Sequence, residues 1–77
     1  MANIIIGGTP EVTEEIERAL QILKKDKYKA AVQEDASSGE LAIRFEFGAT
    51  DQTLKFKKDE WHKAGAIEKK IVDDLDI

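Results

Sequence analysis

The side chains of this sequence that can do acid–base or nucleophilic chemistry are few and isolated. The single histidine, His62, falls in the first turn of a predicted helix, on the side away from its apolar residues, and no nucleophile can be assigned to it. Serine occurs only as Ser37-Ser38 in a loop, and cysteine is absent. Carboxylates are abundant, but none lies in an apolar stretch that would equip it for acid or base catalysis. We therefore expect this chain not to be an enzyme.

Two loops have compositions that can bind simple ions. Gly7-Gly8-Thr9 joins a predicted strand to a predicted helix, where free backbone amides can bind an anion. The glutamates that follow would repel a phosphate, however, and neither a Walker lysine nor a full glycine fingerprint is present. Residues 34–40 gather three carboxylates but lack the alternating oxygen ligands of a calcium-binding loop. We expect two ordinary turns with no metal and no cofactor, and anion binding at the glycines stays open.

The clearest structural pattern is an alternation of apolar and polar residues over residues 41–47 and 53–57. A period of two is typical of a β-hairpin with one buried face and one exposed face. The apolar set predicted to point inward is Leu41, Ile43, Phe45, Phe47, Leu54 and Phe56. The polar set predicted to point outward is Arg44, Glu46, Lys55 and Lys57.

Helices and further strands flank this hairpin. Thr9 is the predicted N-cap of a helix that starts at Pro10, and apolar residues recur at three- and four-residue spacing as far as Leu23. Residues 28–34 alternate as a strand, and residues 3–6 contain three isoleucines, which favour a short strand buried on both faces. A last helix is predicted from Asp59 as its N-cap to residue 75, with a bend at Gly65.

The element order β-α-β-β-β-α predicts one small α+β domain that comprises residues 1–77. Three strands joined by short loops form an antiparallel meander, and both helices pack their apolar stripes on one face of it. If Asn3 to Ile6 joins the sheet as a fourth strand, we expect it to run parallel to the strand that begins at Tyr28. A domain of this length has a core that is only marginally sufficient.

The composition predicts a soluble cytoplasmic protein without a membrane partner. The N-terminal residues lack the basic region and long apolar run of a signal peptide, and no apolar run approaches the ~18 residues of a membrane span. The absence of cysteine suits a reducing compartment. A net charge of −4 disfavours non-specific binding to nucleic acid or to anionic membranes.

Two surfaces are candidates for binding. The outer face of the predicted sheet is mostly cationic, with only Glu46 in opposition, and its basic residues are Lys29, Arg44, Lys55 and Lys57, with Lys58 beside them. An acidic surface is predicted on the two helices, where the C-terminal aspartates oppose the helix dipole. Its residues are Glu11, Glu14, Glu15, Glu17, Asp73 and Asp74.

The sequence thus predicts a small non-enzymatic binding module that contacts an unidentified protein partner, as an accessory protein, inhibitor or adaptor. Contact would be made through the acidic helix faces or the outer sheet face. The alternative is nucleic-acid binding through the basic sheet face, which is disfavoured because the phenylalanines point inward and leave no stacking platform. Self-association through the open face or a strand edge is a third alternative.

Overall fold

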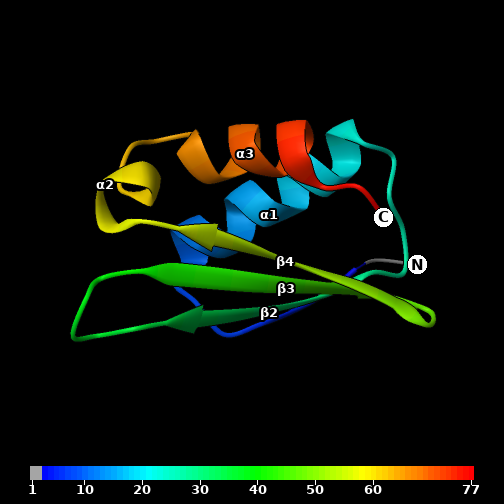
Figure 1. Ribbon diagram of the computed structural model, residues 1–77. Helices are drawn as coiled ribbons and strands as arrows, with labels where there is room; N and C mark the ends of the chain where they lie inside the picture. Colours follow the sequence, from blue (N-terminus) through cyan, green and yellow to red (C-terminus); the bar gives the residue numbers. More distant parts are fainter. Residues whose placement is uncertain (1–2) are drawn as a thin grey trace.

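The computed structural model of the chain describes residues 3–77. It consists of a four-stranded sheet that is covered on one side by helices (Figure 1). The elements are β1 (Ile4–Ile6), α1 (Pro10–Ile22), β2 (Lys29–Glu34), β3 (Leu41–Phe47), β4 (Thr50–Phe56), α2 (Lys58–Trp61) and α3 (Ala66–Asp74). The α+β fold expected from the sequence, with its meander and with helices on one face of the sheet, is confirmed.

The strands follow one another in the order β1-β2-β3-β4, so β1 and β4 are the two edges of the sheet. β1 joins the sheet parallel to β2, because α1 carries the chain back before the next strand begins, and the later pairs are antiparallel. Asn3 fastens the start of β1, since its Oδ1 accepts from the Tyr28 backbone amide at 2.8 Å. Its Nδ2 donates to the Lys25 carbonyl at 3.2 Å.

The core lies between the sheet and the helices. Val12, Ile16, Ala19 and Leu20 of α1 are buried there, as the helical spacing predicts. The inward face of the hairpin is also confirmed, with the exception of one residue. The buried set from the strands and α3 is Ala30, Leu41, Ile43, Phe45, Leu54, Phe56, Ile67 and Ile71.

Phe47 is the exception, because its side chain is 45% exposed. The alternation along β3 directs this side chain to the inner face, but Phe47 is the last residue of the strand, where the chain turns into β4. Its ring stacks on that of Tyr28, with centroids 4.4 Å apart. The prediction that Phe47 is core was therefore wrong, since alternation fixes the direction of a side chain but not what covers it.

Both ends of α1 have defined caps. At the start, the Thr9 Oγ1 accepts from the Val12 amide at 3.3 Å, as predicted. At the end, the Lys25 amide donates to the Leu20 carbonyl at 2.8 Å and the Lys24 amide donates to the Gln21 carbonyl at 3.0 Å. This is the Schellman pattern, in which the residue at Lys24 must adopt a left-handed conformation, and its φ is +57°.

Lys24→Gly is expected to raise the free energy of unfolding by ~0.5–1 kcal/mol, because glycine adopts positive φ without the strain that a Cβ causes. Urea denaturation followed by circular dichroism measures the change. Lys25→Gly is the matched control: its φ is not positive, so the same substitution there is expected to lower stability. Equal losses at the two positions would contradict this account of the helix end.

The second predicted helix is in fact two, α2 and α3. Gly65, with φ +82°, adopts a left-handed conformation that interrupts the helix and serves as the N-cap of α3. The N-cap of α2 is Lys57 rather than the predicted Asp59, and its backbone amide donates to the Glu60 Oε1 at 2.7 Å. The bend expected at Gly65 was thus underestimated, because a left-handed residue ends the helical hydrogen-bond ladder.

Candidate functional site

The face of the sheet opposite to the helices is uncovered, and we call it the open face (Figure 1). The strand registers place Ala31, Arg44 and Thr53 side by side in its middle row. Lys29, Glu46 and Asp51 form the row at one end, and Gln33, Ala42 and Lys55 form the row at the other. On the β1 side, Ile4 lies next to Lys29 and Ile6 lies next to Ala31.

Arg44 at the centre of the open face is ion-paired within the sheet. Its Nη2 lies 3.0 Å from the Asp51 Oδ2, and its Nε lies 3.4 Å from the Glu46 Oε2. Asp51 was not among the predicted residues of this face, because the strand starts at Thr50 and not at the predicted Thr53. With both carboxylates beside Arg44, the open face is closer to neutral than the expected cationic strip.

The five predicted basic residues do not form one cluster. Lys29 and Lys55 occupy opposite end rows of the open face. Lys57 and Lys58 lie beyond the end of β4, at the start of α2. The aliphatic part of Lys58 packs against Gly39, where an added Cβ would come within 3.0 Å of its Cγ and Cδ. Of these five residues, Lys55 and Lys57 line a common groove.

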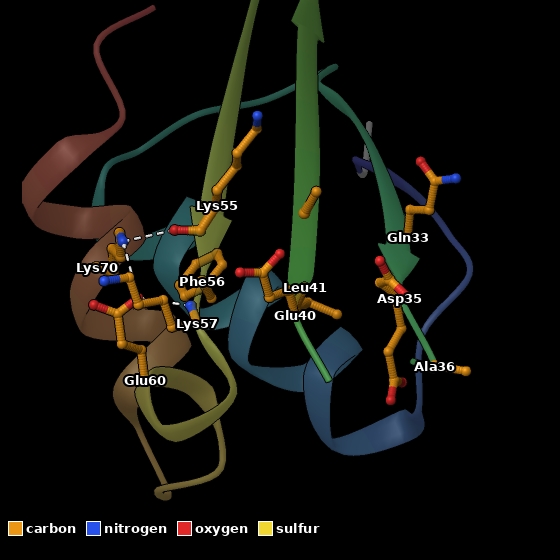
Figure 2. A pocket seen from close by; sticks show the side chains of 12 residues that line it. Gln33, Asp35, Ala36, Glu40, Leu41, Lys55, Phe56, Lys57, Glu60 and Lys70 are labelled. Atoms are coloured by element: carbon orange, nitrogen blue, oxygen red, sulfur yellow. Dashed lines mark hydrogen bonds and ion pairs between the residues drawn. The ribbon is translucent and has the colours of Figure 1, made fainter. Parts of the chain in front are cut away.

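That groove has a volume of about 790 Å³ and lies where β4 meets the β2–β3 loop (Figure 2). Glu34, Asp35 and Glu40 line one side, and Lys55, Lys57 and Lys70 line the other. Lys70 was not among the site residues predicted from the sequence. Its Nζ donates to the Lys55 carbonyl at 2.7 Å and lies 4.9 Å from the centre of the Phe56 ring. Lys70 therefore joins α3 to β4. The apolar residues that line the groove, Leu41 and Phe56, are too buried to contact a ligand.

The β2–β3 loop is ordered by Asp35. Its Oδ1 accepts from the Ser37 hydroxyl at 2.7 Å and from the Ser37 amide at 3.0 Å. These hydrogen bonds, together with those from Ser38, lower the pKa of the Asp35 carboxyl below its usual value. The loop that the sequence analysis expected to be a solvated turn is exposed and built as an Asx turn.

The lowered pKa of Asp35 gives a testable pH dependence. The carboxylate favours the folded state above its ordinary pKa of ~3.9, and this contribution is lost as the pH falls through the lower pKa of the folded protein. The stability difference between the wild type and Asp35→Asn, measured by urea denaturation, is therefore expected to be constant above about pH 5 and to shrink below about pH 4. Glu40→Gln in the same loop is the control. A difference that persists unchanged at about pH 3 would contradict the assignment.

The predicted acidic surface divides into separate parts. Glu11, Glu14 and Glu17 are exposed on α1. Glu15 is buried, with 8% exposure, and its Oε1 accepts from the Glu68 backbone amide at 3.0 Å in the first turn of α3. Its expected exposed position was therefore wrong, because α3 packs against that side of α1 and Glu15 supplies the hydrogen-bond acceptor that Gly65 lacks.

Ion pairs account for other charges on the helical side. Arg18 donates from Nε to the Glu68 Oε1 at 2.8 Å, and this contact raises the pKa of its guanidinium. Asp73 pairs with Lys69 at 3.0 Å. Asp74 is exposed, and its backbone carbonyl accepts from the Gln52 Nε2 at 2.9 Å. The two aspartates therefore lie on α3, apart from the exposed glutamates of α1.

The β1 edge adjoins the open face and carries exposed apolar side chains. Ile4 is 59% exposed and Ile6 is 50% exposed, whereas Ile5 is half-buried and packs toward the core. The expectation that this strand is buried on both faces was therefore wrong, because helices cover only one face of the sheet. Three consecutive isoleucines suit either environment, so composition alone could not distinguish them.

Gly7 and Gly8 form a tight turn against β2. Both have positive φ, and a Cβ on Gly7 would approach the Val32 carbonyl oxygen to 2.7 Å. Close backbone packing therefore explains these glycines without a ligand.

His62 is exposed and stacks on Trp61, with ring centroids 4.2 Å apart.

Within residues 3–77, no three side chains of histidine, aspartate or glutamate gather in a way that could hold a metal ion. None of the helices in that range has the length and apolarity needed to cross a membrane. No protein-family model matches the chain, and no curated protein or solved structure is significantly similar to it.

Proposed function

We propose that this chain is a non-enzymatic protein-binding module that contacts its partner through the open face and the adjoining β1 edge. The observation that carries this proposal is the exposure of Ile4 and Ile6, at 59% and 50%, on an edge strand of the sheet. Exposed large apolar side chains beside polar ones are typical of contact surfaces. Complete burial of one such side chain contributes about 1.5–3 kcal/mol, so covering the exposed halves of two is a substantial gain.

The charges of the open face favour a protein over a nucleic acid. Arg44 is already paired with Glu46 and Asp51, which would repel a phosphate backbone. Lys29 and Lys55 lie in opposite end rows, and the rows between β2 and β4 contain no aromatic side chain on which a base could stack. A protein surface with mixed polar and apolar groups matches this face better.

Affinity capture from a lysate of the encoding organism tests the proposal. Ile4→Thr/Ile6→Thr removes apolar surface from the open face, whereas Ile22→Thr removes an isoleucine that is 56% exposed on α1. We expect wild type and Ile22→Thr to enrich the same partner. The double variant should bind this partner about 30-fold more weakly, because it loses roughly 2 kcal/mol of apolar contact. No enrichment over an unrelated bait, or equal capture by all three proteins, would overturn the proposal.

Nucleic-acid binding is tested separately by mobility shift with single-stranded and duplex DNA and RNA of about 20 nucleotides. We expect no shift near 50 mM salt, at which electrostatic binding is about as strong as it becomes in ordinary buffers. A shift that weakens steeply with salt and is lost in Lys55→Glu/Lys57→Glu would instead establish the alternative function.

A further inference from the structure

We infer that the partner docks an extended, basic segment as an added strand along the free edge of β1, with alternating apolar and cationic side chains. This assignment of partner chemistry rests on the proposed function. The first support is the direction of the backbone groups. The Ile4 amide donates to the Tyr28 carbonyl at 2.9 Å, so the backbone of Ile4 faces β2. Because successive residues of a strand alternate, the amide and carbonyl of Ile5 face the free edge, where an added strand can pair with them.

The open-face side of an added strand would meet apolar side chains. Ile4 and Ile6 both project there from β1, with Ala31 behind Ile6 and Lys29 behind Ile4. Cross-strand pairs of β-branched side chains are favourable, and Lys29 would repel a cation on this side. Alternate residues of the docked segment are therefore apolar.

The helix side of an added strand would meet the Glu17 carboxylate. Glu15 of α1 faces α3, as its hydrogen bond to the Glu68 amide shows. Two residues along a helix correspond to a rotation of about 200°, so Glu17 projects from the side of α1 away from α3. That side is the β1 side, because α3 packs over β4. Glu17 is exposed, whereas Glu14 lines the opposite side of the helix, toward α3, together with Glu15 and Arg18. The residue of the docked segment that faces Glu17 is therefore lysine or arginine.

The same carboxylate argues against a second copy of this chain as the occupant. Antiparallel pairing of two β1 strands about a two-fold axis would extend the sheet and place the two α1 helices about 10 Å apart, at helix-packing distance. Glu17 of each copy would then face the other helix across the axis, and like charges so placed disfavour the pair. A basic segment, in contrast, would be attracted by the Glu17 carboxylate.

Synthetic peptides of about seven residues test this arrangement, one alternating valine with lysine, one alternating valine with glutamate, and one a scramble of the first. Binding to the full chain is followed by NMR titration and by hydrogen exchange of the Ile5 amide. We expect the valine–lysine peptide to shift the signals of residues 3–7 and to slow exchange at Ile5, and the other two peptides to do neither. Glu17→Lys should weaken its binding by about fivefold, as expected for reversal of an exposed charge.

Two further variants test whether binding depends on the position of the charge and on the outward amide of Ile5. Glu40→Lys makes the same charge change in the β2–β3 loop, away from β1, and should leave the affinity within about twofold. Ile5→Pro removes the outward amide while sparing the bonds to β2, and should abolish binding if circular dichroism shows that it folds. If Ile5→Pro does not fold, the effect of Glu17→Lys on peptide binding is the deciding result.

Equal binding of the acidic peptide, no protection of Ile5 by any peptide, or protection of Ile5 by self-association of the chain would each overturn this inference. These failures differ from a failure of the proposed function. A partner that is captured by the wild type and lost with Ile4→Thr/Ile6→Thr would still establish a binding module, which would then contact its partner through side chains without adding a strand.

Discussion

Phe45→Ala is expected to lower the free energy of unfolding by about 3–5 kcal/mol, the usual cost of truncating a buried phenylalanine. Phe45 is fully buried in the middle of β3, an inner strand of the sheet, between Ala30 of β2 and Gln52 of β4. A core of this size supplies little more than about 3–5 kcal/mol in total, so much of the variant population should be unfolded at 25 °C. Circular dichroism and urea denaturation measure the loss.

Phe47→Ala is the matched control, because it makes the same substitution at the exposed end of the same strand. About half of the surface of Phe47 is buried, and its ring stacks on Tyr28, so we expect a cost of about 1 kcal/mol. Equal costs at the two positions would show that the packing between β3 and the helices is not the centre of the core.

Glu15→Ala has the second largest expected effect, a loss of about 2 kcal/mol. The Glu15 carboxylate is buried and accepts a hydrogen bond from the Glu68 amide, in the first turn of α3. Gly65, the N-cap of α3, has no side chain that can cap the helix. Alanine would therefore leave a helix-terminal amide without its acceptor and remove a negative charge that the helix dipole favours there.

Two controls separate this capping role from a loss of packing. Glu15→Gln keeps an acceptor oxygen at the same place, so it should cost about half as much or less. Glu14→Ala removes an exposed carboxylate from the same helix and should change stability by no more than ~0.5 kcal/mol. Hydrogen exchange of the Glu68 amide should accelerate in Glu15→Ala, and an unchanged rate would contradict the capping assignment.

The features of the fold that depend on neighbouring residues could be predicted from the sequence. Thr9 followed by Pro10 specified the start of α1, because a cap and a fixed φ act within one turn. The period-two alternation specified which face of β3 is buried. In contrast, the exposure of Ile4 and Ile6 depends on which face the helices cover, and no pattern within three residues contains that information.

The candidate site was harder to predict because its properties arise between elements. Arg44 is neutralised by Asp51 because the β3–β4 register brings these residues together, and the predicted strand began at Thr53, after Asp51. Glu15 resembled its exposed neighbours in sequence, yet the packing of α3 made it a buried cap. The position of the exposed apolar edge, on which the proposed function rests, therefore required the tertiary structure.

Binding of the partner to the open face and the β1 edge is open to direct measurement by amide hydrogen exchange, compared between the free chain and its complex with the captured partner. We predict slower exchange at Ile5 and along the β1 edge, with little change on the exposed side of α3. Slower exchange confined to α1 and α3, with β1 unchanged, would contradict the claim.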